Sequence, residues 1–258
     1  MSLPARQVGD RPFLVDAGAI ALISLFICLF SQRLQLMTLL VPGVIALRLL
    51  GWLLLPRAER DLDGRAEVAL CVLTTALGAF NDWNSVTRHR IYDYTVPTDL
   101  PGLSHIPVWM LLYWGLILRF VLTVFHWQRV ALPRAPGGAG RAAFLLALVL
   151  ATRQAIYRLY AHPVLSWLPF LLALGAVLVV VRPDRGRLRL LAVVLVVGPA
   201  VEALYIQVGQ LHAYRLGWLA GVPLWILLWW GLAAMIWDDL GTRLMDAIEP
   251  VLAPAARS

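Results

Sequence analysis

The chain contains no lysine, and all 22 of its basic residues are arginine. Without lysine no Schiff base can form with a carbonyl cofactor, which excludes a retinal-binding pigment. Charge of either sign is also scarce, at 14% of 258 residues, whereas 60% are hydrophobic and the mean hydropathy is +0.76. This composition is typical of a multi-pass membrane protein and not of a water-soluble domain.

Cysteine is equally scarce, and both cysteines, Cys28 and Cys71, lie inside apolar runs. We interpret them as small core residues without a redox role. The formal net charge of +7 comes from arginines spread between apolar segments and not from one basic block. Arginines placed in this way face anionic membrane lipids, so nucleic acid is not expected as a partner.

Long apolar runs dominate what remains. Eight of them approach the roughly 20 residues that an α-helix needs to cross a bilayer. They cover residues 13–31, 34–55, 66–86, 106–126, 142–160, 163–181, 189–208 and 221–237. The sequence therefore predicts an all-α, polytopic membrane protein with eight transmembrane helices.

The distribution of arginine predicts the orientation. With the N-terminus inside, fourteen arginines lie in cytoplasmic segments and five in the opposite loops. Cytoplasmic loops are enriched in arginine, so we expect both termini in the cytoplasm and the protein in the cell inner membrane. Arg48 and Arg119 lie toward the inner ends of their helices, where long side chains can extend to the headgroups, and we assign them no function.

The stretch from Glu202 to Gly231 has a counterpart between Asp82 and Gly115. In each copy a carboxylate precedes a tyrosine by twelve residues, and a proline precedes a tryptophan by two. The pairs are Asp82 and Tyr94, Glu202 and Tyr214, Pro107 and Trp109, and Pro223 and Trp225. We interpret this as a tandem repeat of two four-helix halves, residues 1–131 and 142–237, followed by an interfacial amphipathic tail at 238–258.

Three charged residues lie deep in the predicted spans: Asp82, Glu202 and Arg153. Each costs about 2.5–3.5 kcal/mol at the bilayer centre by insertion scales. Their similar depth predicts a shared polar pocket near the outer leaflet. Two hypotheses stay open: a structural ion pair between Arg153 and one carboxylate, or a catalytic or ligand-binding group formed by all three.

Aromatic residues gather at the same level and are the candidate lining of this pocket. They are Trp109, Tyr113, Tyr205, Tyr214, Trp225 and Trp229. Tyr205 follows Glu202 by about one helical turn, so we expect it to steady the carboxylate. The alternative is an interfacial aromatic belt, which membrane proteins form without any ligand.

Histidines also concentrate on the outer side. They are His89, His105, His162 and His212, and Asp93 lies between them in sequence. Their spacings match no zinc or iron motif, so neither a metal nor another cofactor is predicted.

One part of the second copy has a family resemblance. The series Glu202, Gly209, Tyr214, Gly221–Trp225 (Gly-Val-Pro-Leu-Trp) and Trp229 resembles the carotenoid hydratase family of polytopic membrane proteins. The first copy departs from it, with Asp for Glu and His-Ile-Pro for Gly-Val-Pro. The resemblance implies an integral-membrane enzyme that acts on a long isoprenoid.

Physical chemistry is compatible with that activity. A carboxylic acid kept neutral in a dry pocket can protonate an alkene, and aromatic faces can stabilise the carbocation. Two other classes stay open: a transporter or proton- or ion-relaying protein, and a non-catalytic membrane assembly subunit. The transporter hypothesis is weakened by an inner half that we expect to be almost wholly apolar. Membrane lipids are expected neighbours in every case, and the sequence does not define the oligomeric state.

Overall fold

A computed structural model describes residues 6–130 and 137–252. Within them the chain forms eight α-helices, one 3₁₀ turn, one π-helical turn and two short strands. The helices are α1 (Asp10–Phe30), α2 (Leu34–Leu54), α3 (Gly64–Trp83), α4 (Val108–His126), α5 (Ala139–Leu159), α6 (Leu168–Val181), α7 (Arg185–Gln207) and α8 (Leu224–Leu252). The turns are η1 (Arg57–Glu59) and η2 (Asn84–Arg88), and the strands are β1 (Tyr92–Tyr94) and β2 (His212–Tyr214).

Six of these helices are long and apolar enough to cross a membrane, namely α1, α2, α4, α5, α7 and α8. The helix α6 has only 14 residues, and α3 carries Arg65, Glu67 and Asp82. The chain is therefore a helical integral membrane protein, and a count of eight spans stays a prediction.

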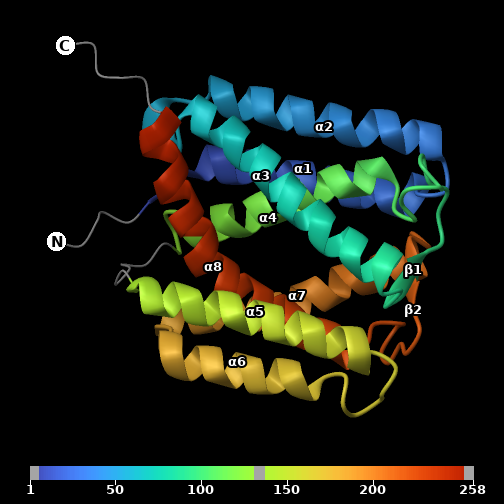
Figure 1. Cartoon of the computed structure of the whole chain (residues 1–258). Coiled ribbons are helices and arrows are strands. Elements are labelled where there is room, and N and C mark those ends of the chain that lie inside the picture. The colour runs from blue at the N-terminus through green and yellow to red at the C-terminus, as the bar shows by residue number, and fades with distance from the viewer. Residues whose placement is uncertain (1–5, 131–136, 253–258) are drawn as a thin grey trace.

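The helices α4 and α8 each pack against several others. Figure 1 shows α8 crossing one side of the bundle, from the ends of α2 and α3 to the level of α5. Helices α1, α2 and α3 pack against α4, and α1 also packs against α2. The same pattern occurs around α8, which contacts α5, α6 and α7 while α5 packs against α6. Contacts of α8 with α3 and α4 join the two groups into one bundle.

The two strands form an antiparallel pair at the end of the bundle opposite the start of α1 and the end of α8 (Figure 1). In the ladder Tyr92 faces Tyr214, Asp93 faces Ala213 and Tyr94 faces His212. An all-α prediction omits this pair, because three-residue segments are too short to show an alternating pattern.

The last helix continues beyond the expected end of the final span. The hydrophobic run stops at Asp238 and Asp239, but α8 extends without interruption to Leu252. Its final turns bury Met245 and Ile248 against Trp52 and other residues at the ends of α2, α3 and α4. Residues 238–252 are therefore part of the bundle, whereas residues 253–258 of the predicted tail lie outside the described residues. The linker expected between the two halves falls largely on residues 131–136, which also lie outside them.

Candidate functional site

Asp82 lies in the last turn of α3 and is completely buried. Tyr94 donates a hydrogen bond to its Oδ2 from 2.8 Å, and the indole Nε1 of Trp114 donates to the same oxygen from 2.9 Å. The hydroxyl of Tyr92 donates to Oδ1. Both oxygens of this carboxylate are therefore occupied by donors, which is what a buried charge requires.

Glu202 holds the corresponding position on α7. Tyr214 donates a hydrogen bond to its Oε1 from 2.7 Å, as Tyr94 does to Asp82. In both cases the tyrosine follows the acid by twelve residues. Where the first copy has Tyr92, the second has His212, whose Nε2 lies 3.8 Å from Oε2 of Glu202. That distance is too long for a hydrogen bond. Burial lowers the pKa of His212 to about 4, so its ring is neutral at ordinary pH.

The strand pair brings the two acids together. Tyr92, bonded to Asp82, lies across the ladder from Tyr214, bonded to Glu202, and the two ring centroids are 5.1 Å apart. The acids thus lie on either side of one cluster of aromatic rings. We define the outer acid cluster as Asp82, Glu202, Tyr92, Tyr94, His212 and Tyr214.

A glycine one turn before each acid permits the close helix packing beneath this cluster. A Cβ on Gly78 would lie 2.7 Å from Trp114, and a Cβ on Gly198 would lie 2.6 Å from Trp230. The two tryptophans occupy equivalent places on α4 and α8, and their rings stack with centroids 6.5 Å apart. Only glycine allows the indoles to approach α3 and α7 so closely.

Arg153 reaches the same end of the bundle from α5. Its guanidinium donates to the hydroxyl of Ser85 and, at 3.4 Å, to the carbonyl of Asn81. It also lies 5.2 Å from the ring centroids of Tyr157 and Trp229. In the described part of the chain no ion pair joins Arg153 to Asp82 or Glu202, and the contacts with Ser85, Asn81 and the two rings hold this arginine instead.

The predicted aromatic lining separates into different environments. Tyr113 and Tyr205 do not serve the acids, because their hydroxyls bond to each other at 2.8 Å and both contact Ser24 of α1. Tyr205 therefore does not steady Glu202 by a hydrogen bond. Of the other residues, Trp225 packs edge-on against Tyr214, Trp229 contacts Phe170 and Arg153, and Trp109 is fully buried in α4.

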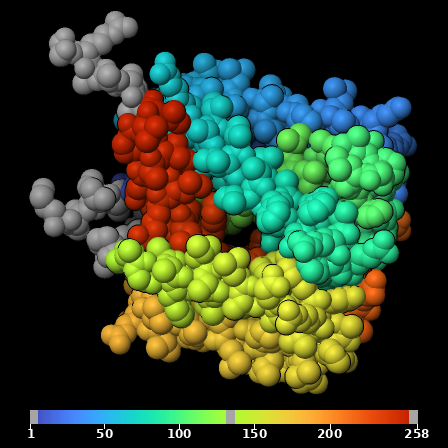
Figure 2. Space-filling view, in the orientation of Figure 1, coloured from blue at the N-terminus to red at the C-terminus, as the bar shows by residue number. Residues whose placement is uncertain are grey.

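The space-filling view shows a hollow between α3, α5 and α8 (Figure 2). Helix α5 packs along α6 and α8. Toward the β1 and β2 end, Tyr157 of α5 accepts a hydrogen bond from Asn84 at 2.6 Å, next to the contacts of Arg153. Polar contacts therefore tie α5 to the end of α3 near the outer acid cluster.

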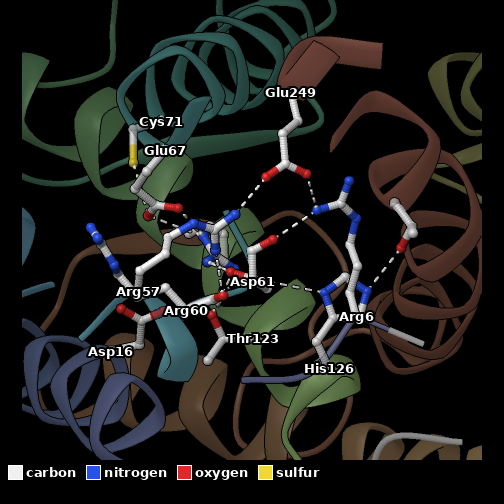
Figure 3. A network of polar contacts seen from close by, with 12 residues as sticks. Arg6, Asp16, Arg57, Arg60, Asp61, Glu67, Cys71, Thr123, His126 and Glu249 are labelled. Atoms are coloured by element: carbon white, nitrogen blue, oxygen red, sulfur yellow. Dashed lines mark hydrogen bonds and ion pairs between the residues drawn. The ribbon is translucent and has the colours of Figure 1, made fainter. Parts of the chain in front are cut away.

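A second polar group lies at the opposite end of the bundle, where α1 begins and α8 ends (Figure 1), and the sequence interpretation missed it. Figure 3 shows part of this group, including Asp61, Glu67 and His126. We call it the inner charge network: Asp16, Arg48, Asp61, Glu67, Arg119, Thr123, His126 and Thr242. Every one of these residues is buried. The expectations that Arg48 and Arg119 extend to the headgroups, and that the inner half is almost wholly apolar, are wrong.

Direct contacts connect the network across five helices. Arg48 pairs with Asp16 at 2.5 Å and with Glu67. Arg119 pairs with Asp61 at 2.7 Å and with Glu67 at 3.0 Å. Three carboxylates thus face two guanidinium groups. Buried charges need such partners of opposite sign for compensation.

The imidazole of His126 completes the network beside Asp61. Its Nδ1 lies 3.1 Å from the carboxylate, and its Nε2 lies 3.0 Å from the hydroxyl of Thr242 on α8. Burial alone would raise the pKa of Asp61, but the charge of Arg119 and the bond to His126 outweigh it and hold that pKa well below its usual range. A sequence signal existed, because charges of both signs, such as Asp16 and Arg48, fall inside predicted spans near the same end.

No cluster that combines three or more histidine, cysteine, aspartate or glutamate side chains in metal-binding geometry occurs in residues 6–130 and 137–252. His89, which we considered as a ligand, stacks on Tyr157 with ring centroids 3.8 Å apart. His212 lies among the tyrosine rings of the outer acid cluster.

No protein-family model and no curated protein matches this chain. Two solved structures share its fold: MvINS, an Insig homologue from Mycobacterium vanbaalenii, and a cross-linked trimer of a cysteine variant of MvINS. Each aligns with a TM-score of 0.55 and 22% identity, over 75% of this chain and 98% of MvINS. The resemblance to carotenoid hydratases is therefore wrong, since the fold is that of an Insig homologue and only a short aromatic motif suggested the other family.

Proposed function

We propose that this chain is a non-catalytic subunit of a membrane assembly, whose helices form a rigid scaffold. The observation that carries the proposal is the bonding of Asp82. This carboxylate is completely buried, and its two oxygens receive hydrogen bonds from Tyr92, Tyr94 and Trp114. A general acid needs a proton within reach of its substrate, whereas these donors surround the carboxylate and fix helices to strands.

Glu202 supports the same conclusion less completely. One oxygen accepts the Tyr214 hydrogen bond, and only 13% of the side chain is exposed. The expected helper Tyr205 is bonded elsewhere, and Arg153 bonds to Ser85. These contacts favour a structural role for the three residues first considered as a catalytic group.

We also propose that the scaffold arose by duplication of a four-helix unit. The recurrence of the same helix pairings around α4 and α8 supports this, as do the equivalent contacts of Gly78 with Trp114 and of Gly198 with Trp230. The cross-linked trimer of MvINS suggests self-association as the form of assembly. Apolar residues that project from α2, α6 and α7, such as Leu47, Leu172 and Val196, are available for contacts with lipid or with further copies.

The decisive experiment compares lipid extracts of cells that express the wild-type chain, Glu202→Gln, or no protein. We expect identical lipid profiles by mass spectrometry. A lipid that appears with the wild type and disappears in Glu202→Gln would contradict the proposal and return the acid to a catalytic role.

Assembly is tested in the same membranes. Single cysteines at Leu47, Leu172 or Val196, in a chain with Cys28 and Cys71 replaced by alanine, are oxidised before electrophoresis. We expect a cross-linked oligomer from the helix that faces a neighbouring copy and monomer from the others. Monomer at every position, together with a monomeric mass in nanodiscs, would contradict self-association.

For orientation we propose that the β1 and β2 end faces outward, with both chain ends in the cytoplasm of a cell with an inner membrane. The arginine distribution supports this, and two exposed positions test it. A membrane-impermeant maleimide added outside should label Arg215→Cys and leave Gly138→Cys unlabelled, with the wild type as control for the native cysteines. Labelling of Gly138→Cys from outside would reverse the orientation.

A further inference from the structure

The two copies of the acid motif differ at one position. In the first, Tyr92 bonds directly to Asp82. In the second, the equivalent residue is His212, whose ring nitrogens are both buried and have no hydrogen-bond partner in the described chain. Oε2 of Glu202 lies 3.8 Å from Nε2 of this ring. The second copy therefore has unused hydrogen-bonding capacity where the first has none.

We propose that Glu202 and His212 form a binding site for the hydroxyl group of a neutral, apolar lipid. A buried donor or acceptor without a partner is costly, so its presence indicates that another group completes it. In this site the hydroxyl of the ligand takes the place that the Tyr92 hydroxyl fills beside Asp82.

The distance between the two residues suits one oxygen atom. Two polar atoms 3.8 Å apart are too far for a direct hydrogen bond, yet a single oxygen can lie at ordinary hydrogen-bond distance from both. The hydroxyl donates to Oε2 of Glu202 and accepts a hydrogen bond from Nε2 of His212. Because the hydroxyl has one proton, which it donates to Glu202, the site requires the neutral imidazole tautomer whose proton is on Nε2.

The surroundings indicate that this hydroxyl belongs to an apolar molecule. The surface of α7 around Glu202 is hydrocarbon, with Val197, Leu204 and Val208 each more than half exposed. A molecule that approaches through the membrane along this face brings a hydroxyl attached to an apolar body. An anionic headgroup is disfavoured here, because burying a charge among apolar side chains is costly.

The test uses the purified full-length chain in nanodiscs, with 1-dodecanol and its methyl ether as matched probes. The ether has the same apolar body but cannot donate a hydrogen bond. We expect dodecanol, and not the ether, to raise the unfolding temperature of the wild type. Glu202→Gln and His212→Phe should lose this shift.

A further variant keeps the proposal testable if those substitutions disturb folding. His212→Tyr copies the first half, where a tyrosine hydroxyl reaches the acid, so it should fold normally and lose the dodecanol shift. Tyr94→Phe removes a hydrogen bond to Asp82 only. This variant should unfold at a lower temperature than the wild type without ligand, yet dodecanol should still raise its unfolding temperature.

Three results would contradict the binding site. The first is an equal rise in unfolding temperature with dodecanol and with the ether. The second is no rise with either probe, as expected if water or a direct His212–Glu202 contact fills the gap, and the third is an unchanged rise with dodecanol in His212→Tyr. The inference is separate from the proposed function. Recovery of chemically altered dodecanol would contradict the non-catalytic role and leave the binding site in place.

Discussion

Replacing Arg119 with methionine tests whether the inner charge network holds the bundle together. Arg119 is fully buried, and its guanidinium contacts Asp61 at 2.7 Å, Glu67 at 3.0 Å and Thr123 at 2.9 Å. Methionine fills a similar length without charge. Glu67 then keeps its pair with Arg48, whereas Asp61 keeps only His126 among the described ion-pair partners.

The expected cost follows from the loss of one partner in a buried pair. Such a change typically destabilises a protein by about 3–5 kcal/mol, because the remaining charge stays buried without compensation. That is a large part of a typical stability of roughly 5–15 kcal/mol. We therefore expect Arg119→Met to be severely destabilised.

A second substitution separates charge from packing. Adding Asp61→Asn to Arg119→Met removes the uncompensated carboxylate, so the double variant should be more stable than the single one. The coupling between the two changes should fall in the range of about 0.5–3 kcal/mol that contacting residues show. Thermal and denaturant unfolding of the purified variants in one detergent measures it.

Arg57→Met is the matched control. Its side chain is 52% exposed and pairs with Glu249 at 2.8 Å, so its loss should cost less than about 1 kcal/mol. Equal destabilisation by Arg57→Met and Arg119→Met would refute the reasoning, and so would strictly additive effects of Arg119→Met and Asp61→Asn.

Three further predictions concern packing and pH. Gly198→Ala should lower stability by about 1–3 kcal/mol, because its Cβ would meet Trp230 at 2.6 Å. Gly175→Ala, whose Cβ would meet nothing within 4 Å, should be neutral or slightly stabilising, and unfolding curves of both check this. Burial lowers the pKa of His212 from 6.5 to about 4, so the unfolded chain binds more protons between these values and stability should fall as the pH drops through that range. This dependence should be absent in His212→Phe when unfolding temperature is followed against pH. The depressed pKa of Asp61 gives a separate contribution, which is present above about pH 3.8 and lost on further acidification, and Asp61→Asn should lack it.

Sequence reasoning located the helices well, because apolar runs of membrane length leave little freedom in their placement. The run expected at 34–55 is α2 (Leu34–Leu54), and the one at 106–126 contains α4 (Val108–His126). The spacing of each acid and its tyrosine also corresponds to real hydrogen bonds, since the loop returns the tyrosine to the acid in both copies.

The partners of buried charges were not predictable from spacing. Whether Arg48 extends to the headgroups or turns inward depends on the rotation of α2 and on the presence of Asp16 and Glu67 on neighbouring helices. The same reason explains Tyr205, which lies one turn from Glu202 yet bonds to Ser24 of α1. The end of α8 was missed because Asp238 and Asp239 interrupt its hydropathy, although their pairing with arginines such as Arg187 and Arg243 lets the helix continue.

The register of the strand pair bears on how separate copies avoid joining incorrectly. Because the strands are antiparallel and Asp93 faces Ala213 at the centre of the pair, an antiparallel pair of two β1 strands in the same register would be centred on Asp93. That mismatched pair would place Asp93 directly opposite Asp93, and like charges at facing positions are destabilising. The correct partner offers Ala213 instead, which carries no charge. Asp93 is exposed and makes no side-chain hydrogen bond in the described fold. Its charge thereby favours pairing of β1 with β2 of the same chain over pairing of strands between copies.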